Sequence, residues 1–182
     1  MKKMKSEALE LCSLATERLR VGATAGMGTQ EFAAAVHAAP HTELRASKVF
    51  DVRFSEVDLM RVVWHGSYML YFEDARELFG QKYDLSYQGY IDHGYYAPIV
   101  EMNFQYKRPI RYGMQPRIDI IYRPAPSAKI VFDYEIRDPE DESLFASGHS
   151  VQVFMDLQYQ MVWENPPFYL EWKRRWGVDF GM

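Results

Sequence analysis

Cysteine is nearly absent from this sequence, since Cys12 is the single cysteine among 182 residues. One cysteine cannot form an internal disulfide bond, and it disfavours a metal site built from thiolates. Such low usage is typical of proteins from a reducing compartment. We therefore expect a cytoplasmic protein.

Long apolar runs are also missing. No stretch approaches the 18 or so consecutive apolar residues that a membrane-spanning helix needs. The N-terminus starts with lysines, as a signal peptide does. However, Glu7, Glu10 and Glu17 interrupt any apolar segment, and no small-residue cleavage site follows. The sequence predicts a soluble protein with no membrane span.

An excess of positive charge is absent too. The net charge is −4 at pH 7, so no overall field attracts nucleic acid. His37 and His41 flank Pro40, which spoils the helical spacing that paired metal ligands need. The glycine-rich segment 22–29 lacks the lysine of a phosphate-binding loop. We expect no nucleic-acid partner, no metal and no cofactor.

Aromatic residues, in contrast, are abundant. They make up 15% of the chain, with thirteen tyrosines. This richness indicates either a broad aromatic core or a groove for a flat or greasy ligand.

Composition divides the chain into three parts. Residues 1–46 are rich in alanine and predict an N-terminal helical extension. Residues 47–156 form the main domain. Residues 157–182 form an aromatic tail with a short helix, which we expect to pack on the sheet or on a neighbouring subunit.

The main domain alternates apolar and polar residues in five segments, which predicts five strands. They are residues 48–54, 99–107, 117–123, 128–137 and 144–156. Between the first two strands, residues 67–82 carry an apolar stripe at helical spacing. One helix must then cover the apolar face of the whole sheet. The pattern predicts an α+β fold in which a five-stranded antiparallel sheet wraps around one long helix.

The candidate reactive residues of the sequence are Asp58 and His65. Asp58 follows the first predicted strand, and His65 stands seven residues later, where the helix begins. The first N–H groups of a helix have no internal partners and can bind an anion or a developing oxyanion. Gly66 permits close approach of a ligand to the backbone. A carboxylate at such a place can attack a carbonyl or activate water, which suits acyl transfer. From the spacing alone the signal for chemistry is weak, and it favours an ordinary turn at Asp58 and a helix cap or packing residue at His65.

The block "VRFSEVDLMRVVWHGSYMLYFEDAR", residues 52–76, resembles the hotdog-fold acyl-CoA thioesterases. It is most similar to the branch of 4-hydroxybenzoyl-CoA thioesterase and the Tol–Pal-associated thioesterases. That branch has an Asp, a Val-Val-aromatic step, a His or Tyr seven residues after the Asp, and "FE-x-AR" in the helix. The segment "YKRPIRYG", residues 106–113, matches a second family motif. The resemblance spans about 110 residues, and the order of elements agrees with the hotdog fold.

The resemblance implies a thioester hydrolase in which Asp58 is the catalytic carboxylate, either as a nucleophile or as a general base. It implies that the backbone N–H of His65 polarises the thioester carbonyl, while the His65 side chain orients water or substrate. We expect substrate contacts from the residues around this pair. Cations of the second motif either meet the phosphates of coenzyme A or form a solvated strand end. These residues are Val63, Trp64, Gly66, Tyr68, Lys107, Arg108 and Arg111. Coenzyme A is then part of the substrate, and related hotdog proteins imply a homodimer or homotetramer.

Several residues depart from the motif or compete with it. Arg61 stands where the family commonly has glycine, so the loop around Asp58 is expected to differ. Glu73 lies in the helix, where another hotdog branch has its catalytic acid, and we interpret it as structural. His93 is interpreted as a loop histidine, although it could line an acyl pocket. His149 lies on a strand with no visible partner.

The sequence therefore predicts an acyl-CoA thioesterase. Two alternatives remain open: a thioesterase acting on an acyl group held by a carrier protein, and a protein that binds acyl thioesters without turnover.

Overall fold

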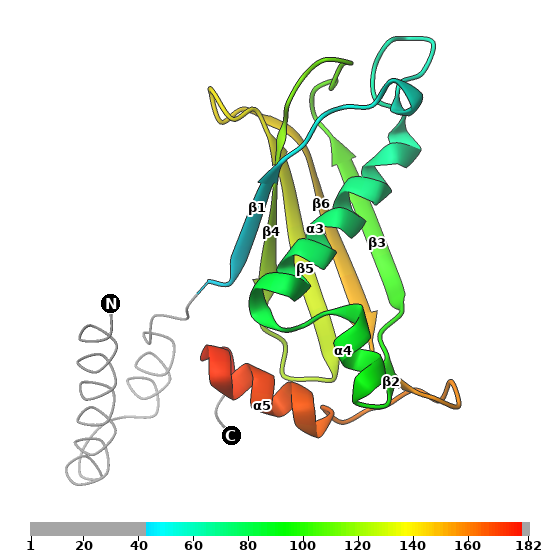
Figure 1. Cartoon of the computed structure of the whole chain (residues 1–182), viewed down its shortest axis with the longest axis vertical. Coiled ribbons are helices and arrows are strands. Elements are labelled where there is room, and N and C mark those ends of the chain that lie inside the picture. The colour runs from blue at the N-terminus through cyan, green and yellow to red at the C-terminus, as the bar shows by residue number, and fades with distance from the viewer. Residues whose placement is uncertain (1–42, 180–182) are drawn as a thin grey trace, which may run out of the picture. The chain divides into compact units, whose positions relative to one another are not determined.

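The computed structural model describes residues 43–179 of the chain. Five strands form the main sheet, and one helix of 16 residues, α3 (Tyr68–Tyr83), lies across one of its faces (Figure 1). The strands are β1 (Arg45–Val49), β3 (Ile99–Tyr106), β4 (Arg117–Arg123), β5 (Lys129–Arg137) and β6 (Leu144–Val153).

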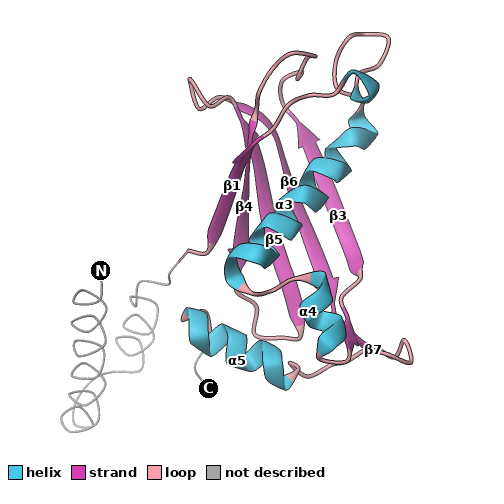
Figure 2. Ribbon diagram, in the orientation of Figure 1, coloured by secondary structure: helices cyan, strands magenta, loops and turns pink. Residues whose placement is uncertain are grey.

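The sheet is antiparallel, with the strand order β1-β4-β5-β6-β3. The chain enters at one edge, passes through α3, and continues at the opposite edge with β3 (Figure 2). The predicted hotdog arrangement, a five-stranded antiparallel sheet packed on one long helix, is confirmed.

Alternating burial explains why the sheet and helix hold together. Along β5, every second side chain is buried and the others are partly or fully exposed. The helix turns its buried stripe toward these residues, and Phe72 and Phe79 have no exposed surface. Burying aromatic side chains contributes most of the apolar area in such a core. The many aromatic residues therefore build the core, which was one of the two interpretations that the composition allowed.

The first strand lies earlier than predicted. The alternation of residues 48–54 predicted a strand there, but β1 covers Arg45–Val49 and pairs with β4. The chain then leaves the ladder, and a 3₁₀ turn follows at Phe54–Glu56. Phe50 is still partly buried because its ring packs on that of Tyr71, 4.3 Å away between centroids. Apolar alternation here reflects packing under α3 rather than strand pairing.

Smaller elements close the far end of the domain. They are α4 (Tyr87–Asp92), β2 (Tyr95–Tyr96), β7 (Met155–Asp156), which pairs with β2, and α5 (Pro167–Trp176). The last predicted strand thus divides into β6 and β7, and α4 was not predicted.

The predicted helix in the tail is confirmed as α5, which ends at Gly177 with φ 67°. Trp172 and Trp176 both donate from their indole nitrogens to the carbonyl oxygen of Tyr83, at 2.7 and 3.0 Å. These bonds satisfy a carbonyl at the C-terminus of α3, where no intrahelical partner exists. The tail therefore packs on the end of α3.

The predicted helices of the N-terminal extension, together with His37 and His41, lie outside the described residues. Arg45 and Ala46, which the prediction gave to that extension, belong to β1. Among residues 43–179, no helix is both long and apolar enough to span a membrane.

Candidate functional site

A hollow of about 300 Å³ lies where α3 begins, between the helix start and the end of β3. It brings together six of the predicted site residues: Asp58, Val63, His65, Tyr68, Lys107 and Arg108. Met60, Val62, Tyr106 and Pro109 complete its lining. Residues 58 and 107 are far apart in sequence, so the fold assembles this site.

Asp58 sits in a tight loop whose two sides pair at Val57 and Val63. Its Oδ1 accepts hydrogen bonds from the backbone N–H groups of Met60 at 2.8 Å and Val62 at 3.5 Å. Its own N–H donates to the carbonyl oxygen of Val62 at 2.9 Å. Asp58 therefore stabilises its turn through one carboxylate oxygen and still lines the hollow.

Arg61 occupies this loop in a left-handed backbone conformation, with φ 62°. Glycine adopts this region without strain, whereas a side chain makes it costly. The geometry explains why glycine suits this position in the family. The Arg61 side chain is exposed and does not line the hollow, which its neighbours Met60 and Val62 do.

Within residues 43–179, the helix start presents an N–H without a partner at His65, which lines the same hollow as Asp58. His65–Ser67 form a 3₁₀ turn that runs directly into α3. The Ser67 N–H donates to the carbonyl oxygen of Trp64, but the His65 N–H donates to no acceptor among residues 43–179. Helix N-termini carry a partial positive charge, so this N–H suits a negatively charged oxygen.

Trp64 and Gly66 do not line the hollow. The Trp64 side chain instead packs over Gly66, and a Cβ on Gly66 would lie 2.1 Å from a ring carbon of Trp64. A larger residue at position 66 would have to displace the half-exposed tryptophan ring, because that ring occupies the side-chain space. We expected a ligand to approach the backbone closely at Gly66, but the Trp64 ring of the same chain occupies that space.

Two tyrosines form a wall of the hollow. The Tyr106 hydroxyl donates to the His65 carbonyl oxygen at 3.1 Å, which links the end of β3 to the helix start. The ring of Tyr68 packs edge-on against that of Tyr106, with centroids 4.9 Å apart. Burial raises the pKa of Tyr68 to about 12, so its hydroxyl stays protonated at neutral pH.

Cations flank the opening. Lys107 and Arg108 line the hollow and are exposed, and the Arg108 guanidinium lies over the Phe145 ring. Arg111 pairs through its backbone with Val62 but does not line the hollow. Two of the three predicted phosphate-binding cations therefore lie at the site, and the third lies beside the Asp58 loop.

Glu56 is a supporting residue that sequence reasoning missed. It is buried, and its Oε2 accepts hydrogen bonds from the Tyr71 hydroxyl at 2.7 Å and the Arg53 N–H at 2.8 Å. Its carbonyl oxygen accepts the Trp64 N–H at 2.7 Å. Glu56 therefore ties the loop of Asp58 to the start of α3. The position of Glu56, two residues before Asp58, does not by itself indicate this role.

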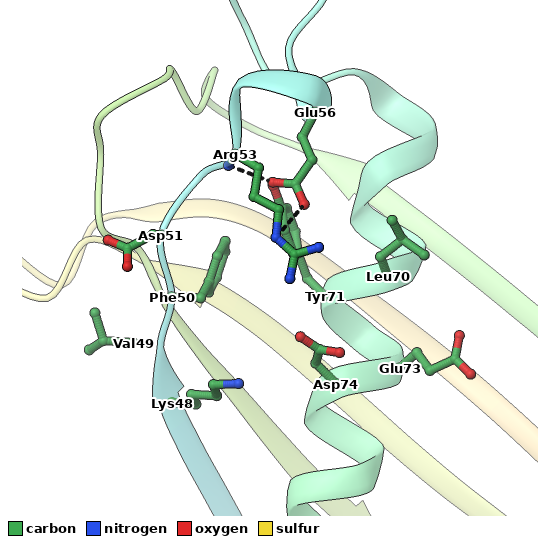
Figure 3. A pocket seen from close by; sticks show the side chains of 10 residues that line it. All are labelled: Lys48, Val49, Phe50, Asp51, Arg53, Glu56, Leu70, Tyr71, Glu73 and Asp74. Carbon is green, nitrogen blue, oxygen red and sulfur yellow. Dashed lines mark hydrogen bonds and ion pairs between the residues drawn. The ribbon is translucent and has the colours of Figure 1, made fainter.

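Glu73 lies at a different hollow, of about 420 Å³, between α3 and the chain after β1. Figure 3 shows this hollow, with Glu56 and Arg53 at one end and Glu73 and Asp74 on the helix. Glu73 is exposed and does not line the hollow that holds Asp58.

Besides His65, residues 43–179 contain two histidines, and neither lines the hollow that holds Asp58. His93 donates from Nδ1 to the Gly89 carbonyl oxygen at 2.7 Å, and its ring stacks on that of Phe168. His149 contacts Asp133 Oδ1 at 2.7 Å, because these residues are directly opposite each other on β6 and β5. The expectation that His149 lacks a partner was wrong, since strand register was needed to find it.

Comparison with known proteins agrees with this architecture. Residues 52–173 match the family model described as the Thioesterase-like superfamily. The chain belongs to this superfamily of hotdog-fold thioester hydrolases. The predicted family relationship is confirmed.

Individual relatives carry related names. YneP of Bacillus subtilis, named as an acyl-CoA thioesterase, is 28% identical over 97 residues, which cover 53% of this chain and 70% of YneP. Slr0204 of Synechocystis, a 1,4-dihydroxy-2-naphthoyl-CoA thioesterase, has a similar structure, with a TM-score of 0.60 and 20% identity over 70% of this chain and 93% of its own. A 4-hydroxybenzoyl-CoA thioesterase variant bound to its substrate has a TM-score of 0.62 and 16% identity over 71% of this chain and 98% of its own.

Proposed function

We propose that this protein hydrolyses an acyl-CoA to the free acid and coenzyme A, with Asp58 as the catalytic carboxylate. The observation that supports this most directly is that Asp58 and the first turn of α3, with the free N–H of His65, meet at one hollow. A thioester carbonyl placed between them meets a base or nucleophile on one side and a donor on the other.

The chemistry has two routes. As a general base, Asp58 removes a proton from water while the water oxygen attacks the thioester carbon. As a nucleophile, its carboxylate attacks first, forms an anhydride, and releases the thiolate before water enters. In both routes the carbonyl oxygen becomes an oxyanion that the His65 N–H stabilises, and the departing sulfur takes up a proton. Losing one such donor typically costs about 2.7–4 kcal/mol of transition-state stabilisation.

Lys107 and Arg108 provide the recognition of coenzyme A. Both are exposed at the opening of the hollow, where phosphates can approach them from solvent. Charge-assisted hydrogen bonds from such side chains bind phosphate. Binding at this opening leaves the acyl group to enter the hollow.

A second copy of the chain is expected to border the site. β3 is an edge strand, with no strand paired to its outer side among residues 43–179. Val100 on this strand is 56% exposed, and unpaired edges with apolar side chains favour pairing with another chain. We propose a homodimer in which two β3 edges meet.

The test is an assay of coenzyme A release from acetyl-, benzoyl- and decanoyl-CoA by the full-length protein. We expect turnover of at least one thioester. The variant Arg108→Ala should raise KM for the acyl-CoA but leave KM for the matching acyl-pantetheine unchanged, because the latter lacks the nucleotide. Lys129→Ala, an exposed lysine on β5, is the control and should change neither.

Two results favour the alternatives. Preference for an acyl carrier protein over the matching acyl-CoA would indicate a carrier-protein thioesterase. Tight binding of acyl-CoA with no hydrolysis of any thioester would indicate a binding protein and would overturn the proposed reaction.

A further inference from the structure

Glu56 joins the loop of Asp58 to the start of α3. Along the chain it stands two residues before Asp58. Its carbonyl oxygen accepts the Trp64 N–H at 2.7 Å, and Trp64 directly precedes His65. The Asp58 carboxylate and the His65 N–H are therefore both connected to the backbone of Glu56, one through the chain and the other through this hydrogen bond.

The direction of the His65 N–H depends on the peptide group that it shares with the Trp64 carbonyl. A trans peptide is planar, so its N–H and its C=O point in opposite directions. The Trp64 carbonyl oxygen accepts the Ser67 N–H at 2.9 Å, which holds one side of this peptide toward the helix. The bond from the Trp64 N–H to Glu56 holds the preceding peptide. A shift of Glu56 therefore turns the His65 N–H as well.

The side chain of Glu56 anchors this junction to α3. It is buried, and its Oε2 accepts hydrogen bonds from the Tyr71 hydroxyl at 2.7 Å and the Arg53 N–H at 2.8 Å (Figure 3). Tyr71 is a buried residue of α3. Its short bond has the length of a strong hydrogen bond between a hydroxyl and a carboxylate. Tyr71 therefore holds Glu56, and with it the junction, against the helix.

Glu56 and Tyr71 do not line the hollow that holds Asp58. Both line the larger hollow of about 420 Å³. A thioester bound beside Asp58 therefore does not touch them. Any effect of this pair on hydrolysis has to pass through the Asp58 loop and the helix start.

We propose that Glu56 and Tyr71 are positioning residues, whose hydrogen bond sets the place of the Asp58 carboxylate relative to the His65 N–H. This inference rests on the proposed function of Asp58 and His65. The attacking group and the oxyanion donor must both be aligned with the thioester carbonyl, and a misplacement of about 1 Å can cost about 100-fold in rate. Loss of the Tyr71 bond should therefore slow the chemical step and leave substrate binding intact.

The experiment measures kcat and KM of the full-length protein for the acyl-CoA that the wild type hydrolyses best. Tyr71→Phe removes the hydroxyl that donates to Glu56 and keeps the ring. We expect kcat to fall about ten-fold while KM changes by less than about two-fold, because Tyr71 does not touch the substrate.

Tyr83→Phe is the matched control. Tyr83 is the last residue of α3, it is also buried, and its hydroxyl donates to the Arg45 carbonyl oxygen at 2.8 Å. The variant removes the hydrogen bond of a buried tyrosine from the same helix, at the end opposite to the Asp58 loop. Its kcat should stay as in the wild type. An equal fall of kcat in both variants would show that a general loss of stability, and not positioning, is responsible.

Two variants of Glu56 test the other partner of the bond. Glu56→Ala removes the acceptor of both hydrogen bonds, so kcat should fall at least as far as in Tyr71→Phe. Glu56→Gln keeps a side-chain oxygen that can accept them, and its kcat should exceed that of Glu56→Ala by about ten-fold. Equal losses in the two variants would contradict a role for these bonds. Tyr71→Phe leaves the Arg53 bond in place, so it remains informative where Glu56→Ala does not fold.

Amide hydrogen exchange separates this inference from the proposed function, because it needs no turnover. The Trp64 N–H should exchange about ten-fold faster in Tyr71→Phe than in the wild type, since its acceptor on Glu56 is held less firmly, and should be unchanged in Tyr83→Phe. A wild type that hydrolyses no thioester overturns the reaction, and the exchange rate then still decides whether the pair holds the helix start. An unchanged exchange rate of Trp64, or full kcat in a folded Tyr71→Phe, overturns the positioning role.

Discussion

The Asp58 side chain stabilises its own turn and is also the carboxylate proposed to act in the reaction. One carboxylate oxygen accepts the N–H groups that close its own turn, and the residue also lines the hollow at the start of α3. The turn holds the carboxylate in place without the help of another side chain. Arg61 in the same turn adopts φ 62°, which a residue with a Cβ adopts at a cost.

Arg61→Gly should therefore stabilise the protein. Relief of the left-handed strain outweighs the added freedom of glycine in the unfolded chain, and we expect the free energy of unfolding to rise by about 0.5–1 kcal/mol. Urea unfolding followed by circular dichroism measures this. Arg61→Ala is the control, since it removes the charge but keeps the Cβ. A stabilisation equal in both variants would show that charge, not backbone strain, is responsible.

The sequence predicted the site residues that belong to one motif. It missed the residues whose roles depend on contacts with parts of the chain far away in sequence. Asp58, His65 and Tyr68 stand in one motif, and they do line one hollow. Glu56 was missed because its partner Tyr71 lies 15 residues away, and the role of Tyr106 because its partner, the His65 carbonyl, lies 41 residues away. Such pairs become visible only when the fold brings them together.

At the scale of elements, β3 is the strand with a free edge beside the site. Its outer side has no paired strand among residues 43–179, and its side chains are mostly exposed. β1 is the other edge strand of the sheet. A dimer through β3 would place the partner next to Tyr106, the last residue of the strand, and Lys107, which follows it.

Val100→Lys should weaken this dimer. A lysine on an exposed edge opposes strand pairing because its charge would have to be buried in the contact. Light scattering at several protein concentrations should show a dimer for the wild type and a shift toward monomer for the variant. Val49→Lys is the matched control, because Val49 is 50% exposed on the opposite edge strand. An equal shift in both variants, or none in either, would contradict a β3 interface.

Periodicity predicted most elements well, and it was clearest for β5, which alternates strictly, and for α3, which has a buried stripe. β4 lies where it was expected, and α3 differs by one residue at each end. β1 was misplaced because Val52 is buried and Phe50 is partly buried outside the ladder. The six-residue helix α4 is too short to show a period.

At the scale of the whole molecule, several tyrosines are buried in the core, and they make the stability of the protein depend on pH in the alkaline range. Burial raises the pKa of Tyr122, like that of Tyr68, to about 12 from 10.0. Below pH 10 both the folded and the unfolded forms keep these protons. Between pH 10 and 12 only the unfolded form loses them, so stability falls by up to about 1.4 kcal/mol per pH unit for each such tyrosine. Burial lowers the pKa of Lys173, which acts in the opposite direction.

The variant Tyr122→Phe should make the loss of stability between pH 10 and 12 shallower, by up to about 1.4 kcal/mol per pH unit. Tyr122 is only 2% exposed, and the hydroxyl of its partner Tyr169 still donates to the Lys129 carbonyl oxygen in the variant. Urea unfolding at several pH values measures the slope. Tyr112→Phe, a change at a residue that is 60% exposed, should leave the slope as in the wild type. A slope that Tyr122→Phe leaves unchanged would contradict this assignment.

The most direct test of the whole account is the rate of thioester hydrolysis by Asp58→Asn. Asparagine keeps the side-chain oxygen that accepts the Met60 N–H, so the turn should survive and the variant should melt like the wild type. We predict that kcat falls at least about 100-fold while the affinity for acyl-CoA is kept. Glu73→Gln, which changes the helix acid at the other hollow, should retain full activity. Full activity in Asp58→Asn, or its loss in Glu73→Gln, would contradict the assignment of Asp58 as the catalytic carboxylate.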